Sequence, residues 1–398
     1  MRTKALYIFL LLALCVAGAG FWKAMRVREI SAATSNTYLT SNTYLRSWSP
    51  EEAASYLDDR EVWWQNWPPA QEEHGTICIS CHTVVPYALA RPELQQELGR
   101  TGVTAAEKTM IGSVEKRVGH WSEMSPFYSD AADGPGKTAE SHATEAVLNA
   151  VILASYDAKQ GHLRPITQTA LDEAWALQEQ AGRNAGGWKW QDFDLAPWES
   201  SESGYQGAAM LAVALGGLPN HYAGESATGE HLERLQAYLQ RQYAAQPVMS
   251  QLYVLWASAR MPGLLDEARR TKLLAEIKSL QQSDGGWSLV SLNKPKIWNW
   301  LDNKSESDGC ATGLTVLALE ESGMSSHDKT LERGLEWLEH HQEKDGSWRA
   351  SSLNTHRDPE SDVGRFMNDA ATGYAVLALE IAQKDTNRVT GPPETDQK

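Results

Sequence analysis

The chain has 398 residues, four cysteines and a formal net charge of −15 at pH 7. A chain of this length buries a large core without cross-links, so a small disulfide-framed domain is excluded. The acidic balance, with no Lys/Arg cluster after Arg28, argues against nucleic acid as a partner. Tryptophan is frequent, with 16 Trp against 5 Phe, and several Trp residues follow glycine, which indicates a repeated structural element.

The N-terminal segment predicts export. An unbroken apolar run over residues 5–21 follows Arg2 and Lys4, the pattern of a signal peptide. Its length is also near the lower limit for crossing a bilayer, so residues 1–30 are either a cleaved signal or an inner-membrane anchor. Both alternatives place the remaining chain outside the cytoplasm, in the periplasm. Residues 31–48 predict a linker, and residues 387–398 a disordered tail.

The segment HGTICISCH, residues 74–82, carries the first chemistry. Cys78 and Cys81 could each add to a haem vinyl group, and His82 could ligate the iron, so the motif predicts haem c. The same thiols could instead form a disulfide or hold zinc, and export favours the haem. The candidates for the sixth iron ligand are Met124, His120 and His142.

An internal repeat organises the rest of the chain. The stretch ATGLTVLALE, residues 311–320, recurs as ATGYAVLALE at residues 371–380. Before each stretch lies a turn that ends in tryptophan, at Trp287 and Trp348, and before each turn an amphipathic helix. One unit is therefore an amphipathic helix, a Gly-Trp turn, an irregular polar stretch and an apolar helix.

Further units extend this pattern towards the N-terminus. The predicted apolar helices start near residues 81, 141, 205, 248, 311 and 371. This register aligns Cys81 and Thr83 with Cys310 and Thr312. Six helix pairs predict an all-α fold, an α/α toroid of about six helical hairpins with inner and outer helix rings. An irregular helical bundle is the alternative.

Tryptophans and carboxylates occur together in two segments before apolar helices. One contains Trp190 and Trp198, and the other Trp298 and Trp300. These segments could line an apolar cavity, where aromatic faces stabilise cations, or could simply cap the ring.

The turns QQSDGGW and QEKDGSW, each followed by an Ala/Leu-rich helix, resemble those of the terpenoid cyclase and protein prenyltransferase superfamily of α/α toroids. The similarity covers about residues 50–385 and is closest to squalene–hopene cyclases, in particular to exported bacterial proteins that carry a CxxCH segment. The resemblance implies a first repeat with a cytochrome c-like segment over 49–135 and cyclase-like repeats over 136–386. It also implies a cavity inside the ring for an isoprenoid or other apolar molecule.

Candidate catalytic residues follow from this resemblance. Squalene cyclases protonate their substrate with an Asp-x-Asp-Asp-Thr motif, which corresponds here to the segment from Asp308 to Thr312. Cys310 stands in the position of the proton donor, and a thiol is a poor acid for this step. Prenyltransferases hold zinc with Asp-x-Cys, which Asp308 and Cys310 match, although Ala371 replaces the expected histidine. An N-capping Asp308 and a buried Cys310 are the structural alternative.

The repeat register predicts that the CxxCH residues, Asp308, Cys310 and His142 face one another across one mouth of the cavity. Three functions remain open at this stage. The first is a haem-bearing protein that binds or transforms an isoprenoid and exchanges electrons with a redox partner. The second is a non-catalytic toroid that binds a ligand or a partner. The third is a zinc-dependent enzyme that resembles the prenyltransferases.

Overall fold

The computed structural model describes residues 48–219, 222, 226–293 and 306–390. The predicted signal or anchor, almost all of the linker and most of the tail lie outside these residues. So does the tryptophan-rich stretch at 294–305. Within the described part of the chain, no helix combines the length and apolarity that a membrane span requires.

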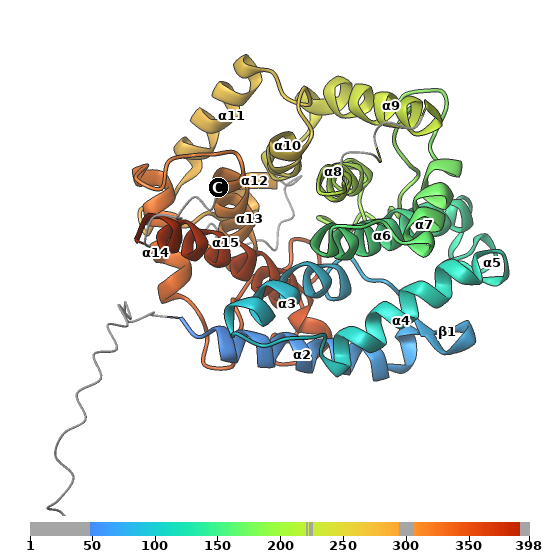
Figure 1. Cartoon of the computed structure of the whole chain (residues 1–398), viewed down its shortest axis with the longest axis horizontal. Helices are drawn as coiled ribbons and strands as arrows, with labels where there is room; N and C mark the ends of the chain where they lie inside the picture. The colour runs from blue at the N-terminus through green and yellow to red at the C-terminus, as the bar shows by residue number, and fades with distance from the viewer. Residues whose placement is uncertain (1–47, 220–221, 223–225, 294–305, 391–398) are drawn as a thin grey trace, which may run out of the picture. The chain divides into compact units, whose positions relative to one another are not determined.

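The described residues form two concentric rings of helices (Figure 1). The outer helices are α2 (Pro50–Asn66), α4 (Ala105–Gly119), α7 (Pro165–Ala176), α9 (Ser226–Gln242), α11 (Glu267–Leu280) and α14 (Lys329–His340). The inner helices are α3 (Val84–Glu97), α6 (Lys137–Gln160), α8 (Ser203–Gly216), α10 (Val248–Arg260), α13 (Gly309–Glu321) and α15 (Phe366–Thr390). Each inner helix contacts the next, and α15 returns to α3. The predicted all-α toroid of six hairpins is confirmed, and an irregular bundle is excluded.

The other described elements are short. The strands β1 (Gln71–Glu72) and β2 (Thr76–Ile77) pair antiparallel just before the CxxCH segment. The short helices are η1 (Pro68–Ala70), η2 (Glu73–Gly75), η3 (Trp121–Glu123), α5 (Asp130–Asp133), η5 (Tyr243–Ala245), α12 (Leu289–Asn293) and η6 (Val363–Arg365).

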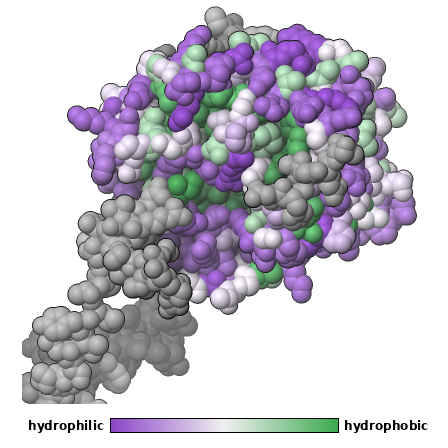
Figure 2. All heavy atoms as spheres, turned by 45° about the horizontal axis from the view of Figure 1, so that its top comes forward, coloured by the Kyte–Doolittle hydropathy of each residue, from purple (hydrophilic) through white to green (hydrophobic). Residues whose placement is uncertain are grey.

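Burial explains the division into two rings. Every residue of α13 from Gly309 to Leu319 is buried, so this helix is surrounded by protein. The outer helix α14 buries only Leu331, Gly334, Trp337 and Leu338, which lie on one face at helical spacing. On the face that Figure 2 shows, hydrophilic side chains cover most of the surface, and hydrophobic ones show mainly in hollows between them.

The tryptophan turns fix each outer helix to the following inner helix. The buried Trp287 donates its indole Nε1–H to the carbonyl of Ile277 at 2.9 Å, and its backbone N–H to Thr312 Oγ1 at 2.9 Å. Trp348 repeats both bonds, to the carbonyl of Leu338 and to Thr372. The hydroxyl of Thr144 likewise accepts a backbone N–H, from Gln191. The predicted register is therefore confirmed for Thr312 and Thr372, whereas Thr144 bonds the turn that precedes the next inner helix.

A repeated glutamine closes the ring. Gln281 donates to the carbonyl of Gly285 in its own turn and to that of Thr330 on the next outer helix. Gln342 makes the same pair of bonds, but its second acceptor is Ser49, at the start of α2. The N–H of Ser49 returns a bond to Gln342 Oε1 at 2.7 Å. The last repeat is thus bonded to the first.

The outer helix α4 had no counterpart in the predicted pattern. Its hydrophobic stripe is weak, but Thr104 and Glu107 form a capping box at its start. A Thr-x-x-Glu pattern is a sequence-level signal for a helix N-terminus, and it marks this helix.

Candidate functional site

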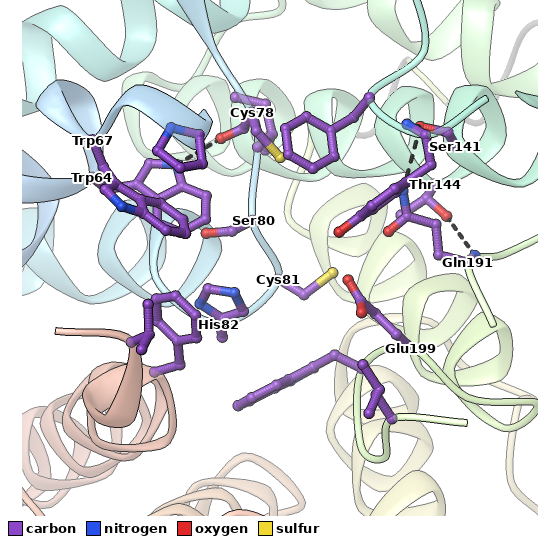
Figure 3. Close-up of a pocket in the computed structure, with 18 of the residues that line it drawn as sticks. Trp64, Trp67, Cys78, Ser80, Cys81, His82, Ser141, Thr144, Gln191 and Glu199 are labelled. Atoms are coloured by element: carbon purple, nitrogen blue, oxygen red, sulfur yellow. Dashed lines mark hydrogen bonds between the residues drawn. The ribbon is translucent and has the colours of Figure 1, made fainter. Parts of the chain in front are cut away.

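The three residues of the CxxCH motif line one cavity of about 350 Å³ (Figure 3). The chain leaves β2 at Ile77, crosses the cavity wall and enters α3 at Val84. Cys78 is fixed by its backbone: its N–H donates to the carbonyl of Ala70, and its carbonyl accepts from Trp64 Nε1, both at 2.8 Å. Ser80 Oγ accepts the N–H of Val84 at 3.1 Å and so caps α3. These bonds hold the motif across the start of an inner helix.

The hydrogen bonds of Thr83 determine the tautomer of His82. Thr83 donates its hydroxyl proton to Asp369 Oδ2 at 2.7 Å. The 2.9 Å contact between Thr83 Oγ1 and His82 Nδ1 must therefore carry the imidazole proton, which leaves a lone pair on Nε2. Burial, then the Arg60 and Arg357 guanidinium groups, lowers the pKa of His82 to about 3. His82 is consequently a neutral imidazole with a free Nε2.

Asp369, which accepts the Thr83 hydroxyl, is itself held by other buried side chains. Its carboxylate accepts a two-pronged bond from Arg60, at 2.7 Å to Oδ1 and 3.0 Å to Oδ2, and a third bond from Tyr56 at 2.9 Å. Arg60 and Asp369 are 4% and 1% exposed. Such a fork places both oxygens rigidly, so the orientation of Thr83 and His82 is fixed through a buried charge pair.

Both thiols are free. Burial raises the pKa of Cys78 and of Cys81, and the facing carboxylates of Glu145 and Glu199 raise the two values further. The thiols are therefore protonated in the folded chain. Figure 3 shows the Cys81 sulfur beside the Glu199 carboxylate. Burial also raises the pKa of Glu199, although Arg357 and Lys137 oppose that shift.

The cavity wall is largely aromatic. Aromatic rings reach it from segments far apart in the sequence; they are Trp64, Trp67, Phe127, Tyr128, Trp198 and Phe366. The His82 ring stacks on Phe366 with centroids 4.0 Å apart and meets Trp64 edge-on at 5.2 Å. Among the tryptophans of the two Trp-rich segments, Trp198 reaches the cavity, whereas Trp190 packs against glycines of α8. Of the polar residues in the cavity wall, Glu199 directly follows Trp198 in a segment noted for its tryptophans and carboxylates, whereas no sequence pattern marked Arg357.

The remaining predicted site residues do not line this cavity. Asp308 caps α13: its Oδ1 accepts the N–H groups of Cys310 and Ala311, and its Oδ2 that of Leu289. Burial raises the pKa of Asp308 to about 7 against these bonds. Cys310 is fully buried between helices. The structural alternative therefore describes Asp308 and Cys310, and the prediction that they share a mouth with the CxxCH motif is corrected.

His142 and Met124 are also placed away from the cavity. His142, near the start of α6, lies beside Trp121 with ring centroids 5.5 Å apart, and its Nε2 is buried without a hydrogen-bond partner. Met124 is buried after η3, whereas Met367 does line the cavity. Tyr253 of α10 and Tyr374 of α15 meet in the core, with hydroxyls 2.7 Å apart.

The CxxCH side chains do not converge as metal ligands. Across the part of the chain that the structure describes, one group of three His, Cys, Asp or Glu side chains has ligand atoms all within 4.8 Å of one another. That group is His74, His120 and Glu123, and it excludes both the CxxCH residues and the Asp308–Cys310 pair.

Comparison with known proteins agrees with the fold. Residues 247–385 match the family model of the squalene-hopene cyclase C-terminal domain. The fold is that of a squalene cyclase-like α/α toroid. Similar solved structures include a polysaccharide lyase, at 13% identity and a TM-score of 0.50, covering 86% of this chain and 99% of the lyase. A UGL protein with the saccharide dGlcA-Glc-Rha-Glc has 10% identity and a TM-score of 0.51, covering 85% and 96%. Such identities show the fold alone, and no curated protein matches.

Proposed function

We propose that this squalene cyclase-like toroid carries haem c, attached through Cys78 and Cys81, with His82 as an axial ligand. The observation that carries the proposal is that two free thiols and a neutral histidine with a free Nε2 line the same aromatic cavity. The haem would supply one-electron chemistry, and a redox partner would exchange electrons with it.

The donor set fits a macrocycle better than a bare ion. A porphyrin binds thioethers at its rim and histidine at its centre, so the three protein atoms must stand apart. Zinc requires ligands about 2.0–2.3 Å from one point, hence close to one another. The sulfurs of Cys78 and Cys81 and the nitrogens of His82 do not form such a cluster. The raised pKa of both thiols also opposes thiolate ligation.

The side chains behind His82 suit the role of an iron ligand. A ligating histidine usually donates its second ring N–H to an oxygen, which fixes the ring and increases its basicity. Here Nδ1–H donates to Thr83, and Asp369 accepts from Thr83 in turn. Met367, which lines the cavity, replaces Met124, His120 and His142 as the residue that could supply a second iron ligand.

A second candidate function uses the cavity alone. Six aromatic rings around about 350 Å³ match the size and apolarity of a small-molecule site, and an isoprenoid chain would bury well there. Asp308, which stands at the start of the cyclase acid motif, is not presented to this cavity, because it caps α13. This candidate is therefore a binding function that does not depend on Asp308.

Haem staining after denaturing electrophoresis tests the first proposal. The full chain, produced in a periplasm with haem maturation, should give a covalent haem band, and Cys78→Ala and Cys81→Ala should lose it. Cys310→Ala is the matched control, because this thiol lies away from the cavity, and it should keep the haem. Removal of residues 1–30 should also abolish the band, since it prevents export. A full chain without covalent haem would overturn the proposal, and binding of an isoprenoid alcohol to that chain would support the second candidate.

A further inference from the structure

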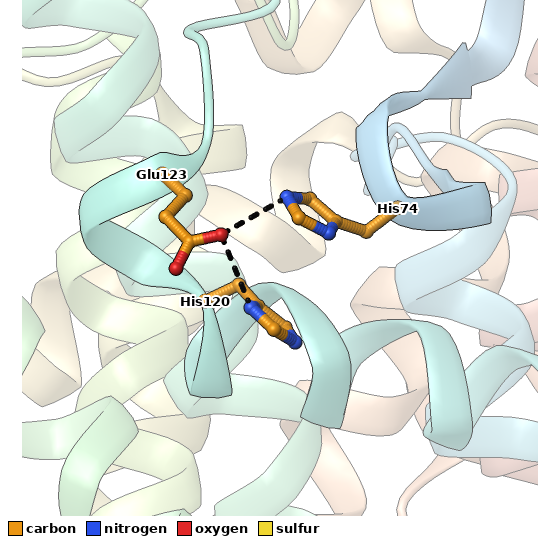
Figure 4. Close-up of side chains that lie close together, drawn as sticks. All are labelled: His74, His120 and Glu123. Carbon is orange, nitrogen blue, oxygen red and sulfur yellow. Dashed lines mark ion pairs between the residues drawn. The ribbon is translucent and has the colours of Figure 1, made fainter.

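Two histidines and a glutamate meet on the surface beside the segment that carries the CxxCH motif (Figure 4). His74 belongs to η2, four residues before Cys78, whereas His120 ends α4 and Glu123 lies in η3. His74 Nε2 is 3.3 Å from Glu123 Oε2, and His120 Nδ1 is 3.4 Å from the same oxygen. The three side chains are 37%, 46% and 60% exposed. An ion from solution can therefore reach them.

Both contacts are ion-pair distances that are longer than a charge-assisted hydrogen bond. A hydrogen bond from imidazole to carboxylate usually measures about 2.7–2.9 Å. Around zinc, ligand distances of about 2.0–2.1 Å in a tetrahedron separate neighbouring ligand atoms by about 3.3–3.4 Å. Both nitrogen–oxygen separations here match that spacing. The two imidazole rings stack nearly parallel with centroids 4.5 Å apart, and each ring has one nitrogen near the same Glu123 oxygen.

The backbone at His74 gives a second, independent observation. His74 has φ 57° and ψ 19°, and the following Gly75 has φ 64°. The left-handed conformation costs a residue with a Cβ about 1–2 kcal/mol, and glycine would adopt it freely. This conformation is uncommon for a residue other than glycine, although histidine adopts it more often than most. This backbone turns the imidazole towards His120 and Glu123, as Figure 4 shows.

We propose that His74, His120 and Glu123 form a binding site for a divalent transition-metal ion, with zinc as the cation that their chemistry fits best. Two imidazoles and one carboxylate are ligands that zinc accepts, and exposure of the cluster leaves a fourth position for water.

The site would join the segment before β2 to the end of α4, and both lie next to the cavity that contains the CxxCH residues. His74 precedes β2, and β2 lies along α4: Ile77 N–H donates to Ser113 at 2.9 Å, and Arg117 donates to Thr76 Oγ1 at 2.8 Å. An ion held by His74 and His120 would add a bond at the end of α4. The metal thus stabilises the hairpin from which the CxxCH segment leaves, whether or not haem is attached.

Cobalt and zinc titrations of the untagged full chain test the site. The metal-free chain should bind one Zn²⁺ by calorimetry, and Co²⁺ should give a visible spectrum without thiolate charge-transfer bands. His74→Ala, His120→Ala and Glu123→Gln should each weaken binding at least tenfold. The matched control is His327→Ala, because His327 is exposed and lies 4.0 Å from the single carboxylate of Glu332. That control should change affinity less than twofold.

The cysteine variants separate this proposal from the haem proposal. Cys78→Ala with Cys81→Ala should retain zinc binding, since the site contains no thiol. Binding lost in that double variant but kept in His74→Ala would move the metal to the CxxCH motif and overturn the inference. Absence of stoichiometric binding by a chain with unchanged circular dichroism would also overturn it, and haem staining would be unaffected by either result.

Discussion

Asp369→Asn should be the most destabilising single change of charge near the cavity. The substitution keeps the side-chain volume but removes the charge that Arg60 requires, and the new amide N–H₂ faces the donors of Arg60 or Thr83. Both charged groups are almost fully buried. Removing one partner of a buried ion pair costs about 3–5 kcal/mol, because the other charge stays desolvated. We expect a loss of that size in the free energy of unfolding.

The matched control is Asp362→Asn. Asp362 Oδ1 also pairs with Arg60, at 3.1 Å, but the Asp362 side chain is 55% exposed. An exposed pair contributes about 0–1 kcal/mol, so this variant should unfold within about 1 kcal/mol of the wild type. Urea unfolding at pH 7, followed by circular dichroism on haem-free chains, measures both losses. Equal losses, or a loss below about 1 kcal/mol for Asp369→Asn, would refute the view that this buried pair anchors the site.

Two further substitutions test the ring and the buried acids. Gly346→Ala should destabilise the chain by about 1–3 kcal/mol more than Gly323→Ala. Both glycines have positive φ, so that cost is shared. A Cβ at Gly346 would in addition lie 2.1 Å from the carbonyl of Glu52, whereas a Cβ at Gly323 would meet open space. Equal melting temperatures would contradict the tight closure between last and first repeats. Burial raises the pKa of Glu61 to about 8, so the folded chain holds a proton that the unfolded chain releases, and stability should fall as pH rises from about 5 to 8. Glu61→Gln should remove up to about 1.4 kcal/mol per pH unit of that fall, and unchanged pH dependence of urea unfolding would contradict it.

Most of the fold could be predicted from the sequence, because each repeat unit contains patterns that are recognisable over a short stretch of chain. Apolar inner helices, Gly-Trp turns and threonines at a fixed register can be recognised one unit at a time, and the hydrogen bonds of Trp287 and Trp348 confirm that register. The candidate site was predicted only in part. The CxxCH residues are local, but their partners Asp369 and Glu199 reach them across the closed ring, and no local pattern specifies which positions meet there.

Equivalent positions also failed to share one site, since in a ring of six hairpins the inner-helix starts lie around a circumference. Asp308 and Cys310 occupy the positions in the fifth hairpin that the CxxCH residues occupy in the first. Their surroundings differ: Asp308 bonds backbone N–H groups of its own neighbourhood, and Cys310 is sealed by adjacent helices. Repeat register therefore predicts where along its inner helix a residue lies, but not which residues of other hairpins it contacts.

The first repeat differs from the later ones in the hydrogen bonds of its inner-helix threonine. In later repeats the inner-helix threonines Thr312 and Thr372 accept the backbone N–H of a tryptophan turn. In the first repeat Thr83 stands in the same register but makes other bonds. Its hydroxyl instead accepts from His82 and donates to Asp369. A hydroxyl that elsewhere holds the scaffold together thus orients an imidazole. Because one satisfied hydrogen bond is exchanged for another, the first repeat accommodates the CxxCH segment without leaving the Thr83 hydroxyl unpaired.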